Sequence, residues 1–277
     1  MSPQPGTLTL DRRRSSRSNP LASPRMRPFL GFATFLILLE TLPRIGIVNP
    51  AYFPPFSQIL AALAQQVLIV EFWIALGQTL MGWALGLTIA VVGGVVLGLV
   101  LGANRWLRDF THSTIEFLRP IPSVALIPLV VLLFGTSMQS TLVLVVYASI
   151  WPIIVQVLYG VQDVDLVARD TARSYRLSWW RQIASVIWPS ALPFAMTGFR
   201  LAAAIALILE ITGELIIGSP GIGQRIAVSQ SSGAVANMYA LVAVTGVLGV
   251  AMNILARRLS RASMHWHSSI RRDEVSR

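Results

Sequence analysis

The sequence contains no cysteine and no lysine, and charged residues of any kind are scarce. The absence of cysteine excludes disulfides and thiolate chemistry. The absence of lysine excludes a Walker-type P-loop, because that loop places a lysine against the nucleotide phosphates. We therefore expect no cofactor and no ATP site of that type in this chain.

Charged residues amount to 12% of the 277 residues, whereas an ordinary soluble domain carries about a quarter. Hydrophobic residues amount to 54%, and the mean hydropathy is +0.65. A membrane-spanning helix needs about 20 apolar residues, so the chain has room for about five or six spans and little else. The composition indicates an integral membrane protein.

Six apolar segments predict an all-α, polytopic membrane protein with about six transmembrane helices. They cover residues 29–47, 74–101, 121–134, 141–159, 191–217 and 239–255, and the third is broken by Pro122 and Pro128. After a proline-marked stretch, Ser57 is expected to cap a short amphipathic helix that lies on the membrane surface. Glycines spaced four residues apart in the second segment predict close helix packing.

All 22 positive charges are arginines, and twelve of them lie in residues 1–27 and 257–277. Residues 1–27 are predicted to form a disordered tail, residues 28–258 the transmembrane domain, and residues 259–277 a second tail. Arginines also gather in segments 103–119 and 160–188, so the positive-inside rule places both termini and these two loops in the cytoplasm. We expect the basic clusters to contact anionic lipid rather than nucleic acid. A signal peptide is the competing interpretation of the first apolar segment, but no small-residue cleavage site follows it.

The loop at residues 163–188 has helical patterning. Asp165 is a plausible N-cap, and Arg169, Arg173 and Arg176 follow the i, i+4, i+7 spacing that puts them on one helix face. Ser178 is expected to cap a second short helix that ends at Pro189. One interpretation is a pair of arginine-rich helices that rest on lipid headgroups.

The same loop resembles the signature of permeases from binding-protein-dependent ABC importers, in which Glu-Ala-Ala, three residues, Gly and nine residues precede Ile-x-Leu-Pro. Here Asp170-Thr171-Ala172, Arg176 and Val186-Ile187-Trp188-Pro189 follow that spacing. Segments 118–122, 190–193 and 197–202, and Glu214 with the following Gly221-Ile222-Gly223, resemble the nitrate/sulfonate/taurine branch. The resemblance extends from about residue 53 to residue 256.

This resemblance implies a type I permease that forms the path for a small solute such as nitrate, a sulfonate, taurine or a related organic anion. It implies a transport subunit without its own ATPase site, in a bacterial cell membrane. The implied partners are cytoplasmic ATP-binding subunits, an extracytoplasmic substrate-binding protein and a second permease copy. The residues that it implies for coupling to the ATPase are Asp170, Thr171, Ala172, Arg173, Arg176, Ser178 and Pro189.

Arg176 stands where the family has glycine. A residue other than glycine costs roughly 1 kcal/mol if the backbone there has a positive φ. The substitution indicates a different turn, a specialised ATPase partner, or loss of function through drift.

Charged residues also lie within or beside the apolar segments, where an unpaired charge is costly and often functional. Arg200, Glu210 and Glu214 are the candidates for the solute pathway, with Arg200 as the ligand for an anion. Glu116 is expected to pair with Arg119 instead, and the alternative for Glu40 and Glu214 is that both are solvated near span ends. The rival hypothesis is an ion-coupled carrier or channel that uses Glu40, Glu210 and Glu214 as a proton relay, although the sequence has no evident internal repeat.

Overall fold

The computed structural model describes residues 27–263 and divides the chain into two compact units, residues 1–57 and 58–277. All the regular structure in this described range is helical. Most of the two predicted tails, residues 1–26 and 264–277, lies outside it. The predicted domain boundaries therefore stay a prediction.

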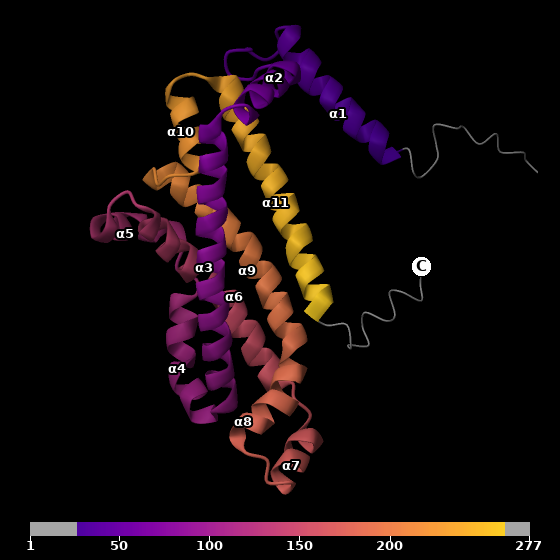
Figure 1. Cartoon of the computed structure of the whole chain (residues 1–277), viewed down its shortest axis with the longest axis vertical. Helices are drawn as coiled ribbons and strands as arrows, with labels where there is room; N and C mark the ends of the chain where they lie inside the picture. Colours follow the sequence, from indigo (N-terminus) through magenta and orange to yellow (C-terminus); the bar gives the residue numbers. More distant parts are fainter. Residues whose placement is uncertain (1–26, 264–277) are drawn as a thin grey trace, which may run out of the picture. The chain divides into compact units, whose positions relative to one another are not determined.

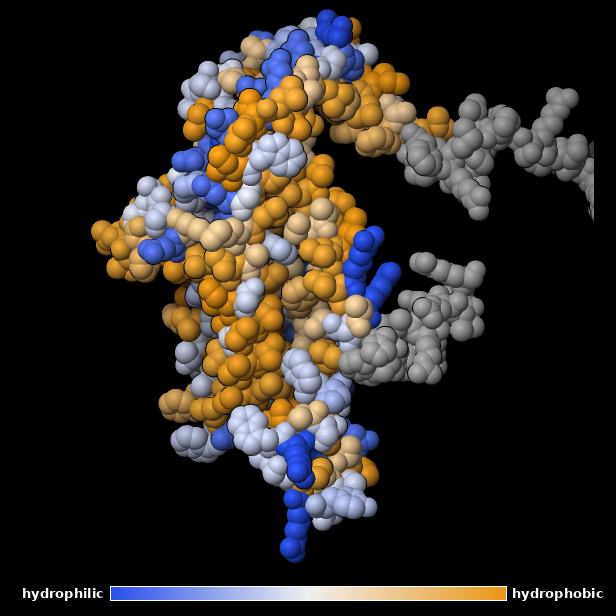
Figure 2. Space-filling model, in the orientation of Figure 1, coloured by the Kyte–Doolittle hydropathy of each residue, from blue (hydrophilic) through white to orange (hydrophobic). Residues whose placement is uncertain are grey.

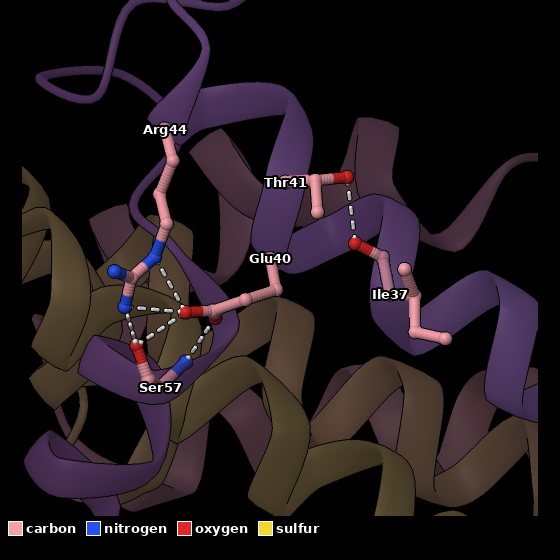
Figure 3. Close-up of polar contacts among 5 residues, drawn as sticks. All are labelled: Ile37, Glu40, Thr41, Arg44 and Ser57. Atoms are coloured by element: carbon pink, nitrogen blue, oxygen red, sulfur yellow. Dashed lines mark hydrogen bonds and ion pairs between the residues drawn. The ribbon is translucent and has the colours of Figure 1, made fainter.

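The first unit contains α1 (Arg27–Arg44) and the start of α2 (Phe56–Val67). The Glu40 carboxylate joins the two, as Figure 3 shows: it accepts hydrogen bonds from Arg44 Nε at 2.7 Å, from Ser57 Oγ at 2.9 Å and from the Ser57 N–H at 2.8 Å. Ser57 lies inside α2 rather than at its predicted cap position, and Glu40 supplies the capping oxygen instead. Glu40 therefore has a structural role.

Four long helices form the second unit: α3 (Val70–Ala103), α6 (Met138–Gln162), α9 (Trp188–Ile217) and α11 (Val235–Ser263). Each is long and apolar enough to cross a membrane, α9 together with the turn before it. With 34 residues, α3 is about 51 Å long and exceeds the roughly 30 Å hydrocarbon core. Hydrophobic residues cover much of the visible face of the long helices in Figure 2. The predicted segments 74–101, 141–159, 191–217 and 239–255 all fall inside these helices.

Glycines on one face of α3 let α6 approach closely. A Cβ atom at Gly86, Gly94, Gly98 or Gly102 would lie within 2.8 Å of a valine or isoleucine side chain of α6. The two backbones can meet only because no side chain stands between them, as expected where lipid offers no hydrophobic drive for association. The packing predicted from the glycine spacing is confirmed.

The third predicted span, residues 121–134, forms the second half of a bent pair of helices. After α3, the Asn104 side chain accepts the N–H groups of Trp106 at 3.0 Å and Leu107 at 3.3 Å and starts α4 (Arg105–Leu118). Segment 103–119, predicted to be a loop, is therefore mostly helix. The chain then breaks at Pro120 and Pro122 and turns by 82° into a short 3-10 turn, η2 (Ser123–Leu126), and α5 (Ile127–Phe134).

In the described residues the spans number four, or up to five if this bent pair counts as one. The difference from the predicted six is α1, which forms a helix but carries Arg27, Glu40 and Arg44 within 18 residues. A charged residue is costly in lipid, so α1 falls short of the apolar composition of the other spans. Its membrane crossing stays a prediction.

Candidate functional site

The loop at residues 163–188, called the coupling loop below after the role that the resemblance implies, starts with the predicted N-cap. Asp165 Oδ1 accepts the N–H of Val167 at 2.6 Å and that of Ala168 at 3.4 Å, and α7 (Leu166–Ser174) follows. An aspartate at this position satisfies amides that the first helical turn leaves without partners. Figure 1 shows α7 at one end of the second unit, beside the end of α6 and the start of α9.

The end of α7 explains the departure from the family signature at residue 176. The N–H of Arg176 bonds to the Arg173 carbonyl at 2.9 Å, and that of Leu177 bonds to the Ala172 carbonyl at 3.1 Å. This pair of bonds is a Schellman motif, whose C′ residue normally is a glycine in the left-handed region. Arg176 occupies it with φ of 52°, and in the described range no other residue except glycines has a positive φ. The turn expected for the family is kept, with arginine in the place of glycine.

Two contacts hold α7 on the bundle. The Arg169 guanidinium donates a hydrogen bond to the Val161 carbonyl at 2.7 Å, at the end of α6, and Ala172 is buried with 4% exposure. Asp170 and Arg173, by contrast, are exposed and form an ion pair with 3.7 Å between nitrogen and oxygen. The predicted arginine stripe stops at Arg173, because the left-handed turn takes Arg176 out of the helix.

The second short helix of the loop does not end where the sequence predicts. α8 (Trp179–Gln182) has Ser178 at its N-cap position, but the Ser178 side chain makes no capping bond. A π-helical turn, η3 (Ile183–Ile187), then leads without a break into α9. Pro189 lies in the first turn of α9, where its missing N–H is tolerated, so it does not end the helix.

Of the charged residues within the spans, Glu214 is the one most fully bound. Its carboxylate accepts the Thr79 hydroxyl at 2.7 Å and the Gly223 N–H at 2.8 Å, and Thr79 accepts the Ile222 N–H at 2.9 Å. The site joins α3, α9 and the start of α10 (Ile222–Ser231). Glu214 is fully buried rather than solvated near a span end.

Glu210 lies one helical turn before Glu214 and is 2% exposed. Its Oε2 atom has no hydrogen-bond partner in the described part of the chain. It packs against α3 at Gly82, where a Cβ atom would overlap the carboxylate. Sequence analysis did not single out Thr79, which approaches this region from a segment 135 residues away.

The other intramembrane candidates have different surroundings. Arg200 donates a hydrogen bond to Thr197 Oγ1 at 3.4 Å and lines a cavity of about 170 Å³ with residues of α11, including Gly249 and Met252. Glu116 pairs with His112 at 3.5 Å instead of the predicted Arg119. The structure therefore brings Glu210 and Glu214 together and leaves Arg200 apart from them.

Two sequence relatives match nearly the whole chain. The taurine transport system permease protein of Escherichia coli (strain K12) is 28% identical over 249 residues, which cover 87% of this chain and 90% of the relative. The permease protein assigned to aliphatic sulfonate transport in Bacillus subtilis (strain 168) is 25% identical over 244 residues, 88% of each chain.

A solved structure has the same fold. A chain of a bacterial ABC transporter that imports the acidic polysaccharide alginate superposes with a TM-score of 0.61 and 15% identity, covering 86% of this chain and 97% of that one. The family model described as "Binding-protein-dependent transport system inner membrane component" matches residues 94–264, which include α6, the coupling loop and α9. This chain belongs to that family, and it is the membrane-spanning permease subunit of an ABC importer.

Proposed function

We propose that residues 170–178 dock the permease onto a cytoplasmic ATP-binding subunit and transmit the closure of that subunit to the membrane helices. The observation that carries this proposal is a short helix held on one side and exposed on the other. Arg169 bonds α7 to the end of α6 and Ala172 is buried, while Leu166, Val167 and Tyr175 are between 73% and 78% exposed. Large apolar side chains exposed around a helix are typical of a protein contact.

The connection from α7 to α9 can transmit a displacement of α7. Beyond the Schellman turn, α8, η3 and α9 follow one another with no loop between them. Movement of α7 by a partner would therefore act on α9 directly and on α6 through the bond from Arg169. Packed helices of this kind switch between discrete arrangements, which suits a change of access from one side of the membrane to the other.

The partners follow from the same scheme. ATP binds to the partner subunits, because this chain has no lysine for a P-loop. A substrate-binding protein delivers the solute at the opposite face, and a second copy of the permease completes the path.

The α7 end faces the cytoplasm. The start of α4, with Arg105 and Arg108, lies at the same end as the coupling loop with its arginines (Figure 1).

The solute is a small anion, such as a sulfonate, taurine or nitrate. The taurine and sulfonate permeases that match most of the chain support a solute with a sulfonate group. The arginine that sequence analysis selected as its ligand, Arg200, faces α11.

Co-purification with the ATP-binding subunit tests the docking helix. The variant Arg173→Glu plus Arg176→Glu reverses two exposed charges on the coupling loop, and Arg257→Glu plus Arg258→Glu makes the same change of charge near the end of α11. We expect wild type and the α11 variant to retain the ATPase and the coupling-loop variant to lose it while it still elutes as a folded protein in detergent.

The rival carrier mechanism predicts a different result. If wild type binds no ATPase and yet moves solute into liposomes under an ion gradient, the proposed function is wrong. The network around Glu214 would then be the candidate ion site. Glu40 would not belong to it, because Glu40 is bound by Arg44 and Ser57 in the other unit.

A further inference from the structure

A cavity of about 400 Å³ lies beside the break between α4 and α5. Its walls come from the break itself, from the middle of α6 and from α9, and include Arg119, Ile121, Trp151, Gln156 and Leu201. A volume of this size is within the range of pockets that bind small molecules.

The non-helical break between α4 and α5 lines this cavity. Non-helical backbone inside a membrane is tolerated where protein buries it or where it lines a cavity. At this break the Tyr147 hydroxyl donates a hydrogen bond to the Leu118 carbonyl at 2.7 Å, which satisfies an acceptor that the helix end leaves open. Discontinuous helices commonly build ligand sites in transporters in this way.

Hydrogen-bond donors on the cavity wall lack acceptors. Glu116, the expected partner of Arg119, pairs with His112, and Arg119 is an exposed residue without a side-chain partner within residues 27–263. Trp151 lines the same cavity, and its Nε1 atom is buried without a hydrogen-bond partner. A buried donor without an acceptor is costly, but Trp151 Nε1 has almost no accessible surface, so Arg119 and Gln156 are the donors of this wall that a ligand can reach.

The charge of the cavity favours one class of ligand. Arg119 is the one charged residue among its lining residues, so no acidic side chain there neutralises the guanidinium. Arginine binds planar or branched oxyanions with several donors at once. The remaining wall is largely apolar, with Ile121, Val155 and Ile205.

We propose that this cavity binds the solute: Arg119 holds the anionic oxygens, Gln156 adds a donor, and the apolar wall contacts a short hydrocarbon part. The ligand class is a small organic oxyanion such as an alkanesulfonate. Arg119 also lines a second cavity of about 340 Å³, with Arg108, Gln162 and the paired His112 and Glu116. The two cavities share Arg119 and lead toward the α7 end, so the site lies on a route for an anion. This inference rests on the proposed transport of an anion.

Equilibrium binding to the complete importer tests the site. The complex of permease and ATP-binding subunits is placed in phosphatidylcholine nanodiscs, and labelled ethanesulfonate is the probe. We expect saturable binding to wild type that unlabelled ethanesulfonate displaces and ethylammonium does not. Arg119→Gln should weaken it at least tenfold, Arg119→Lys should recover part of it, and Gln156→Ala should weaken it several-fold. Arg200→Gln, which removes an arginine that lines a different cavity, should leave it unchanged.

Three results would overturn the site. They are no saturable binding to wild type, equal affinity in Arg119→Gln and wild type, and loss of the binding in phosphatidylglycerol nanodiscs, which would assign the cavity to a lipid headgroup. Each is distinguishable from failure of the proposed function, because retention of the ATP-binding subunits is measured on the same samples. An importer that keeps those subunits but fails these tests has its solute site elsewhere.

Discussion

Replacing Arg176 by glycine should stabilise the end of α7. Arg176 has φ of 52° at the C′ position of a Schellman motif. The left-handed conformation costs an L-residue roughly 1–2 kcal/mol, whereas glycine adopts it freely. Glycine loses more backbone entropy on folding, by about 0.5–1 kcal/mol. The difference leaves a gain of about 1 kcal/mol for Arg176→Gly.

Hydrogen exchange measures this gain at the bonds that define the motif. The amides of residue 176 and Leu177 donate to the Arg173 and Ala172 carbonyls, so both are protected only while the turn is closed. A gain of about 1 kcal/mol in local opening free energy slows their exchange about fivefold. The control is Arg176→Ala, which also removes the charge but keeps a Cβ atom and therefore the strain.

The two variants separate strain from charge. Slower exchange of Leu177 in Arg176→Gly, with no comparable slowing in Arg176→Ala, is the expected pattern. Equal exchange in wild type and Arg176→Gly would refute the reasoning, because the left-handed backbone would then carry no cost. Equal slowing in both variants would attribute the effect to the guanidinium.

Two substitutions test the packing of α3 against the buried carboxylates, both followed by thermal unfolding in detergent. Thr79→Val removes a hydroxyl that bonds to Glu214 and to the Ile222 N–H, and should lower the free energy of unfolding by about 2 kcal/mol. The control Thr88→Val removes a hydroxyl that bonds only to its own helix and should change this free energy little. Equal effects of the two substitutions would contradict the account. Gly82→Ala should lower the free energy of unfolding by about 1–3 kcal/mol because its Cβ would overlap Glu210, whereas Gly77→Ala meets no atom within 4 Å and should not be destabilising. A harmless Gly82→Ala would mean that the Glu210 carboxylate can turn away from α3 without cost.

Local chemistry made part of the coupling loop predictable from the sequence. Asp165 acts as an N-cap within three residues of its own position, so no distant part of the chain decides it. The spacing of the family signature located the turn at Arg176, and the backbone there is left-handed as for glycine. The apolar segments of α3, α6, α9 and α11 were predictable because lipid imposes length and composition on a span.

Competition between partners made other contacts unpredictable. Glu116 had two cationic or titratable neighbours on its helix, Arg119 at i+3 and His112 at i−4, and the spacing alone did not choose between them. The bond between Thr79 and Glu214 joins residues 135 positions apart, so it depends on how α3 and α9 pack. Pro189 was taken for a helix end, but at the first turn of α9 proline needs no N–H partner.

The cavity beside Arg119 could not be predicted from the sequence, because it too depends on how distant helices pack. Its walls come from three separate elements, and Arg119 lacks its expected acidic partner because Glu116 pairs with His112. Arg200 was the more obvious arginine because it lies inside an apolar segment. In the structure it faces α11, and its neighbour Leu201 lines the cavity instead.

The most direct test of the central claim is a crosslink between α7 and the ATP-binding subunit. Because the chain has no cysteine, Thr171→Cys provides one thiol, on an exposed position of α7, for a photoactivatable crosslinker. Ser231→Cys, exposed at the end of α10, provides the matched control. The account predicts that the ATP-binding subunit is crosslinked from residue 171 in the assembled importer and not from residue 231. No crosslink from residue 171, or equal crosslinking from both positions, would contradict it.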